Sequence, residues 1–323
     1  MERHQLALYL GAILVGGLVG FLAPGTAGGL ERSITPVLVL LLYATFLGIP
    51  FASIGRAAKD FRFLTTILVL NFAMVPAVVF GLTRFIADDQ ALLLGVLLVL
   101  LTPCIDYVIV FTGLAGGASD RLLAAAPVLM LAQMLLLPVY LFLFTGPGVV
   151  SAIDSGPFIE ALLVFIIIPM TAAALTQALA RKHPSSRAIM ALMEGLMVPL
   201  LMATLIVVIG SQITAVGSKI DSLLAVVPIY AAFLLIMVPL GMLAAKPALL
   251  DASARRAVVF SGATRNSLVV LPLALALPEP LSLAALVVVT QTMIELVGMI
   301  FFVWAVPRLI PDNPRCHPIH PID

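Results

Sequence analysis

Four side chains with reactive or ionisable groups stand within long apolar stretches of the sequence: Cys104, Asp106, Arg265 and Glu295. An ionisable group at the centre of a bilayer costs about 2.5–3.5 kcal/mol even on a permissive insertion scale. We therefore expect each of these groups to face the protein interior or a water-filled route. A thiol can bind soft species, a carboxylate can carry a proton and a guanidinium can hold an ionised acid, so the set predicts a functional site inside the membrane.

The cysteine lies in the segment Thr102-Pro103-Cys104-Ile105-Asp106. Pro103 lacks a backbone donor and clashes with the preceding turn, so we expect the helix to break here. Backbone groups freed within a membrane are tolerated only against protein or beside a cavity, which makes the break a candidate binding site. Cys104 is either a small buried apolar residue or a ligand for a soft species such as arsenic(III) or copper(I). As a single thiolate it would bind weakly and reversibly.

A second polar segment, Thr264-Arg265-Asn266-Ser267, interrupts a later apolar stretch. We expect Asn266 and Ser267 to contribute to the same binding site as the first break. For Arg265 two interpretations remain. A salt bridge with Asp106 locks two crossing helices together, or the same pair opens and closes and so couples proton movement to the substrate.

Glu295 lies midway through the last apolar stretch. It either forms hydrogen bonds with neighbouring Thr or Gln side chains or titrates as a proton carrier. Asp106 and Glu295 are therefore the candidate proton carriers, and Arg265 is the cation expected to hold whichever acid is ionised.

The composition requires a membrane around the whole chain. Of its 323 residues, 62% are hydrophobic and 10% are charged, whereas soluble domains have about 45–50% and 25%. A bilayer core needs about 20 mostly apolar residues per helix. We therefore expect an all-α polytopic protein that forms a single membrane domain over residues 1–323. The ten predicted spans are residues 6–22, 34–53, 64–86, 91–115, 122–145, 158–180, 188–211, 222–245, 256–277 and 281–306.

Basic residues are concentrated on one side of this topology. With a cytoplasmic N-terminus, thirteen Lys and Arg residues fall in inside segments and three in outside loops. The positive-inside rule then predicts that both termini are cytoplasmic, in the inner (plasma) membrane of the cell. The outside residues are Arg32, Arg84 and Lys219, and the inside residues are Arg3, Arg56, Lys59, Arg62, Arg121, Arg181, Lys182, Arg187, Lys246, Arg255, Arg256, Arg308 and Arg315.

The predicted spans divide into two five-helix units, residues 6–145 and 158–306. Because each unit has five spans, the two enter the membrane in opposite orientations. Both polar interruptions fall in the fourth span of their unit. This pattern predicts two inverted repeats whose broken fourth and ninth helices cross near the midplane.

Residues 307–323 are expected to form a cytoplasmic tail. It contains Cys316, His317 and His320, and short Cys/His tracts can bind metals. The surrounding prolines and the terminal position favour disorder instead.

Enzymatic function is excluded by what the spans lack. Intramembrane proteases need paired acids, a Ser with His or Lys, or a zinc-binding His cluster. No histidine falls within a predicted span, and Asp106 is the only deep aspartate. The loops contain no Gly-rich nucleotide-binding motif, and no basic cluster could follow a nucleic-acid backbone. We expect a secondary transporter without cofactor or resident metal, with a channel as the alternative within membrane proteins.

The segments Thr102-Pro103-Cys104 and Thr264-Arg265-Asn266-Ser267, with Gln291 to Glu295, identify a resemblance that covers nearly the whole chain. The sequence resembles the arsenite efflux permeases of the arsenical-resistance-3 type, in the superfamily that also holds the bile-acid sodium symporters. The resemblance implies ten spans with both termini inside, a fourth-span cysteine needed for transport, here Cys104, and a last-span acid, here Glu295. It also implies that trivalent arsenic or antimony hydroxide is expelled in exchange for protons.

Three positions depart from the family pattern. Ile105-Asp106-Tyr107 replaces the small and apolar residues that usually follow the cysteine, and Ser261 stands about where the sodium symporters carry an acid. Arg265 replaces a neutral amide. These differences favour protons over sodium as the coupling ion. The alternative is a sodium- or proton-coupled carrier of an organic anion, whose carboxylate would be received by Arg265 and the helix N-termini.

Overall fold

A computed structural model describes residues 2–48, 59–105, 107–152, 160 and 163–311. Every regular element in these ranges is helical, and an isolated antiparallel bridge pairs Pro103 with Arg265. Two π-helical turns, Leu70–Met74 and Leu163–Ile167, join α4 to α5 and precede α10. The α-helices are α1 (Glu2–Leu22), α2 (Ala27–Gly48), α4 (Phe61–Val69), α5 (Val75–Thr83), α6 (Gln90–Leu100), α7 (Tyr107–Leu114), α8 (Ser119–Ala152), α10 (Ile168–Ala180), α11 (Pro184–Ser218), α12 (Ile220–Leu224), α13 (Val227–Ala245), α14 (Ala252–Ala263), α15 (Ser267–Leu275) and α16 (Leu283–Leu309).

Seven helices of the described residues are long and apolar enough to cross a membrane. They correspond to the second, third, fifth, sixth, seventh, eighth and tenth predicted spans. Helix α6 is shorter than a full span, and so are residues 11–22, the part of α1 whose side chains the structure describes throughout. The fourth and ninth predicted spans are each divided into two short helices, α6 with α7 and α14 with α15. The all-helical prediction is confirmed, and the breaks reduce the number of uninterrupted spans.

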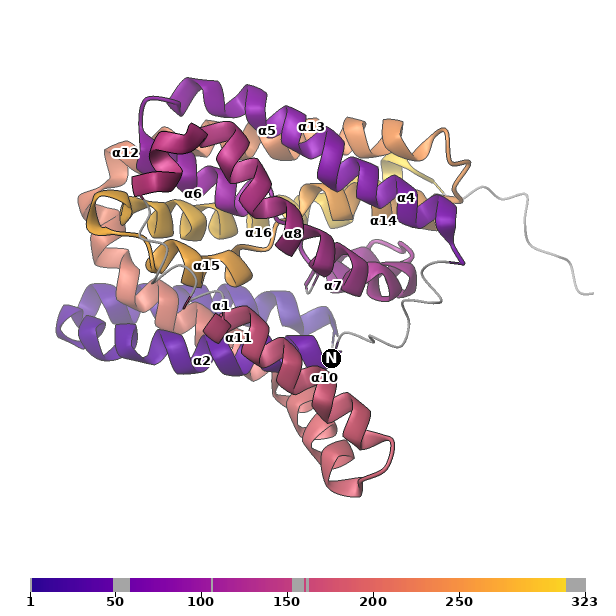
Figure 1. The fold of residues 1–323 in the computed structure, drawn as a ribbon, viewed down its shortest axis with the longest axis horizontal. Coiled ribbons are helices and arrows are strands. Elements are labelled where there is room, and N and C mark those ends of the chain that lie inside the picture. The colour runs from indigo at the N-terminus through magenta and orange to yellow at the C-terminus, as the bar shows by residue number, and fades with distance from the viewer. Residues whose placement is uncertain (1, 49–58, 106, 153–159, 161–162, 312–323) are drawn as a thin grey trace, which may run out of the picture.

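The helices form two groups (Figure 1). Helices α1, α2, α10 and α11 pack together as what we call the four-helix bundle. Ala12 and Leu205 form a small core within it, and α1 approaches α11 closely at Gly16, where a Cβ atom would lie 2.9 Å from the Ile206 carbonyl oxygen. The other helices form what we call the main body, which includes both interrupted pairs. This division places the interrupted helices on one side of a boundary between two packed units.

Helix α6 is buried along almost its whole length and packs against α16. At Gly95 the two helices are so close that a Cβ atom would lie 2.7 Å from the Val287 Cβ atom and 2.8 Å from the Ala284 carbonyl oxygen. Small residues allow such close helix contacts within membranes.

Gly95→Ala is therefore expected to force α6 away from α16 and lower the melting temperature, with a loss of about 1–3 kcal/mol, as is typical of overpacking. The matched control is Gly81→Ala in α5, where a Cβ atom would have no neighbour within 4 Å. Thermal unfolding of the detergent-solubilised variants tests the prediction. Equal melting temperatures for the two variants would contradict it.

An ion-pair cluster joins three helix starts at one end of the main body. Arg121, in the first turn of α8, lies with Nε 3.5 Å from Asp60 Oδ2 and Nη1 3.0 Å from Asp251 Oδ1. The Asp60 side chain caps α4, and Asp251 is the N-cap residue of α14. Burial alone would raise the pKa of Asp251, but the hydrogen bond from Ser253 and the charge of Arg121 outweigh it and lower the pKa below 3.8.

Because the folded-state pKa of Asp251 is lowered, its stabilising contribution is present at neutral pH and is lost as the pH falls through that folded value. Asp251→Asn is expected to lower stability by less than about 1 kcal/mol, since the ion pair is half exposed. The difference in melting temperature from wild type should shrink as the pH falls from about 5 towards 3. A difference that grows on acidification would show that another group controls the cluster.

Candidate functional site

The two interrupted helices meet at their interruptions. The Cys104 amide donates a hydrogen bond to the Thr264 carbonyl oxygen at 3.2 Å, and the Asn266 amide donates to the Thr102 carbonyl oxygen at 2.8 Å. Pro103, which lies between Thr102 and Cys104, has no amide hydrogen to donate. The breaks thus satisfy each other's backbone groups, which a lipid environment requires.

The four half-helices place opposite ends at this crossing. Helices α6 and α14 end there, and α7 and α15 begin there. The Asn266 side chain caps α15 by accepting a hydrogen bond from the Val269 amide at 3.2 Å. Helix C-termini favour a positive charge and N-termini a negative one. The crossing can therefore hold a cation on one side and an anion on the other.

The cation is Arg265, whose side chain is fully buried. Its Nη2 donates to Asn71 Oδ1 and the Ser261 carbonyl oxygen, both at 2.8 Å, and to the Gly262 carbonyl oxygen at 2.6 Å. Nη1 lies 3.3 Å from the carbonyl oxygen of Leu100, the last residue of α6. The hydrogen bonds that the structure describes for the guanidinium all go to neutral oxygen atoms.

The anion is Glu295 of α16, which is 1% exposed. Its Oε2 accepts hydrogen bonds from the Arg265 backbone amide at 2.8 Å and from Gln291 Nε2. Its Oε1 accepts from the Tyr107 hydroxyl at 2.6 Å, and that hydroxyl is also 2.8 Å from the Arg265 carbonyl oxygen. Arg265 therefore holds Glu295 through its backbone, while its side chain points to a different set of partners.

A cavity of about 920 Å³ lies between the four-helix bundle and the main body on one side of the crossing. Ile105, which directly follows Cys104, is part of its wall. Arg181 and Arg187 stand at its other end, where α10 turns into α11, and both are exposed. The polar residues of the wall are Thr45, Gln177, Arg181, Arg187 and Glu194.

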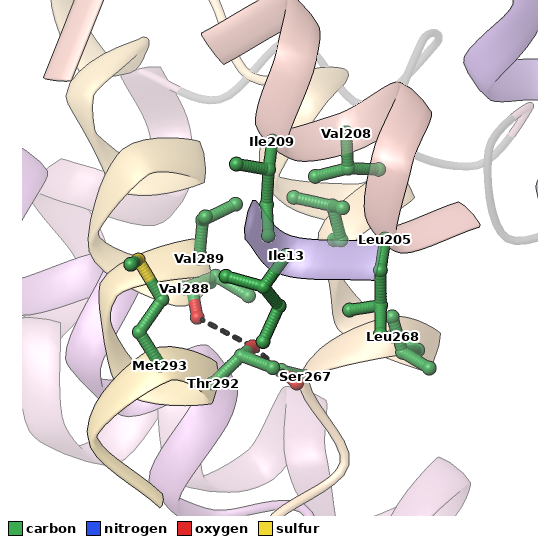
Figure 2. A pocket seen from close by; sticks show the side chains of 11 residues that line it. Ile13, Leu205, Val208, Ile209, Ser267, Leu268, Val288, Val289, Thr292 and Met293 are labelled. Carbon is green, nitrogen blue, oxygen red and sulfur yellow. Dashed lines mark hydrogen bonds between the residues drawn. The ribbon is translucent and has the colours of Figure 1, made fainter. Parts of the chain in front are cut away.

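On the other side of the crossing the two units are closed against each other (Figure 2). The space there is about 10 Å³, close to the minimum that one water molecule needs. Ile13, Leu205 and Ile209 of the four-helix bundle face Leu268 and Val289 of the main body across it. The crossing is thus reached by a large cavity from one side and sealed by apolar side chains on the other.

Comparison of the sequence with known proteins identifies the family of the chain. Residues 35–219, more than half of the chain, match the Sodium Bile acid symporter family. The chain belongs to this family. A curated relative, the arsenical-resistance protein Acr3 of Corynebacterium glutamicum, is 27% identical over 192 residues, which cover 55% of this chain and 51% of that protein. The match therefore spans about half the length of the relative.

These findings confirm the resemblance to the arsenical-resistance-3 type of the family. They also support the prediction of a membrane transporter over an enzyme, because the family is one of symporters. With its long apolar helices, this member of the bile acid symporter family is a multi-pass membrane protein.

The residues expected to contact a substrate are all at the crossing. Thr102, Pro103, Cys104, Asn266 and Ser267 are buried there. The Ser267 hydroxyl also joins α15 to α16, because it accepts a hydrogen bond from the Thr292 hydroxyl of α16, as Figure 2 shows.

Two predicted sites fall outside the described residues. One is Asp106, and with it the expected contact between Asp106 and Arg265. The other is the possible metal-binding tract of the tail, formed by Cys316, His317 and His320.

The sequence interpretation missed Asn71 and the role of Tyr107. A hydrogen bond from a neighbouring Gln side chain was one of its two interpretations for Glu295, and Gln291 makes it. Asn71 lies in a π-helical turn, a feature often found at functional sites. The signal that could have identified Asn71 is the presence of a polar amide side chain within an apolar span. Tyr107 gave no such signal, because its importance depends on a contact with Glu295, which is 188 positions away in the sequence.

Three buried polar atoms near the crossing have no hydrogen-bond partner among the described residues: Arg265 Nε, Asn266 Nδ2 and Gln291 Oε1. Buried polar atoms in folded proteins nearly always have partners. Two hydrogen-bond donors and one acceptor beside the crossing are therefore available for further hydrogen bonds.

Proposed function

We propose that the protein is a secondary transporter that expels trivalent arsenic or antimony hydroxide in exchange for protons. The observation that carries the proposal is the buried crossing, which is open to a cavity of about 920 Å³ on one side and sealed on the other. A site that faces one side at a time is what coupled transport requires. Movement of the four-helix bundle against the main body would exchange the open and sealed sides.

The chemistry of the crossing supports a metalloid hydroxide as the substrate. Cys104 supplies a soft ligand, and the next residue, Ile105, reaches the cavity. The unpaired atoms of Asn266 and Gln291 can bond hydroxyl groups. The buried carboxylate of Glu295 would repel an anion but not a neutral hydroxide. We assign Thr102, Pro103, Cys104, Asn266 and Ser267 to the substrate site.

For coupling we assign the proton to Glu295 or Asp106. Glu295 is held by three hydrogen-bond donors and lies beside the substrate site. Protonation would remove its charge and change what Tyr107 and Gln291 can bond. Arg265 keeps a fixed positive charge on the other side of the crossing.

The topology predicted from the sequence is part of this proposal. The ten spans would form two inverted repeats, residues 6–145 and 158–306, in the plasma membrane with both termini and the tail in the cytoplasm. The ion pairs of Arg121 with Asp60 and Asp251 bring predicted inside segments together, which supports their placement on one side of the membrane. The cavity with Arg181 and Arg187 at its end would then open to the cytoplasm.

A second candidate is the transport of an organic anion with sodium or protons. One observation favours it: the cavity is as large as those that bind drug-sized ligands, and Arg181 and Arg187 give it positive charge. Uptake that depends on sodium, or a Cys104→Ser variant without effect, would favour this candidate.

Arsenite retention in a sensitive host strain tests the proposal. Cells that express the protein are expected to retain less arsenite than cells with an empty vector, and an uncoupler that removes the proton gradient should abolish the difference. Replacement of sodium by choline should leave it unchanged. Equal retention in both strains, or an effect that requires sodium, would overturn the proposal.

A further inference from the structure

We propose that the guanidinium of Arg265 occupies a binding site for a small monovalent cation, as a covalently attached replacement for an exchangeable ion. This inference goes beyond the proposed function, because it concerns what the crossing binds when the side chain is removed. It does not depend on the identity of the substrate.

The atoms around the guanidinium are those that coordinate monovalent cations. They are three backbone carbonyl oxygens, from Leu100, Ser261 and Gly262, and the side-chain oxygen of Asn71. Rings of carbonyl oxygens replace the hydration shell of such ions in channels. In transporters with broken helices, unwound carbonyls and half-helix C-termini coordinate sodium or protons.

The charge balance fits one positive charge. Leu100 is the last residue of α6, and Ser261 and Gly262 lie in the last turn of α14. Each helix C-terminus carries the equivalent of about half a negative charge, so the two together compensate one cation. Among the described residues, the carboxylate at the crossing is Glu295, and its oxygens accept hydrogen bonds from other donors. The site is therefore matched to a monovalent ion and not to a divalent one.

The oxygen atoms are positioned independently of Arg265. The Asn71 amide nitrogen donates to Ser261 Oγ and to the Ile67 carbonyl oxygen, both at 3.0 Å, which fixes the direction of Oδ1. The carbonyls belong to helices, and the Phe233 ring lies 5.4 Å from the guanidinium carbon and offers its face to a cation. Removal of the side chain would leave a preformed, buried and negatively polarised space.

The consequence for the wild-type protein is that this site needs no ion from solution. Its stability and transport should be the same in sodium, potassium and choline salts. Arg265→Ala should instead depend on a cation small enough to enter the vacated space.

The test is the melting temperature of purified, detergent-solubilised Arg265→Ala at constant ionic strength in choline, potassium or sodium chloride, with methylguanidinium added at low concentration. We expect the variant to be less stable than wild type in choline and to recover several degrees, saturably, with sodium or methylguanidinium. The matched control is Arg256→Ala. Arg256 is also a buried arginine that donates to carbonyl oxygens, those of Gly116 and Ile310, and its loss should not be relieved by any particular cation.

A melting temperature of Arg265→Ala that is equal in all salts would overturn the proposal, as would the same cation effect in Arg256→Ala. If Arg265→Ala does not fold, the melting temperature of Arg265→Lys in the same salts tests the proposal instead. Near-wild-type stability of the lysine variant in every salt supports a cation site, and instability equal to that of alanine overturns it. Because the readout is stability, a failure of arsenite transport would leave this result intact.

Discussion

Glu295→Gln is expected to abolish transport driven by a pH gradient and to leave the protein folded. The amide has the shape of the carboxylate and can still accept hydrogen bonds from the Arg265 amide and Gln291, but it cannot carry a proton. The cost in stability should be about 1–3 kcal/mol, because the contact with Tyr107 is weakened inside a buried site. Accumulation of arsenite in membrane vesicles under a pH gradient measures the first effect and thermal unfolding the second.

The matched control is Glu194→Gln, since Glu194 is an exposed acid in the cavity wall. This variant should keep both its stability and its response to the gradient. Gradient-driven accumulation retained in Glu295→Gln would contradict the role of Glu295. Asp106→Asn would then be expected to lose coupling, which would transfer the proton to Asp106.

Cys104→Ser is expected to abolish arsenite transport with a change in stability within about 1 kcal/mol. The side chain is 1% exposed, and serine is nearly isosteric with cysteine. The hydrogen bond to Thr264 comes from the backbone of residue 104, so it persists in the variant. What disappears is the soft ligand, because a hydroxyl binds trivalent arsenic far less well than a thiolate does. Arsenite retention in sensitive cells measures the loss.

Cys316→Ser is the control, because Cys316 is the other of the two cysteines in the sequence. It should export arsenite like wild type. If Cys104→Ser also exports normally, the cysteine is a small buried residue without contact to the substrate, and the organic-anion alternative gains support.

The position of the site could be predicted from the sequence because its signals are local. Pro103 cannot continue a helix, and the polar run around Arg265 is too costly to expose to lipid. Both helices break at these points, and the breaks are joined by backbone hydrogen bonds. The presence of a charged residue in an apolar span likewise predicted that Glu295 faces the protein interior, and its side chain is buried.

The partners of these residues could not be predicted, because they depend on packing between distant segments. Asn71 contacts Arg265 across 194 positions, and Tyr107 contacts Glu295 across 188. The predicted contact between Arg265 and Asp106 lies outside the described residues, and the described hydrogen bonds of the Arg265 side chain go to carbonyl and amide oxygens. The cavity and the sealed side are also products of how the four-helix bundle meets the main body.

Arsenite uptake by inverted membrane vesicles tests the central claim most directly. In such vesicles the lumen corresponds to the cell exterior, so an acid-inside gradient should drive uptake by proton exchange. Wild type is expected to accumulate arsenite only under this gradient, and a sodium gradient should not replace it. An absence of arsenite uptake, together with sodium-driven uptake of an organic anion, would show that the protein is not a proton-coupled arsenite exporter.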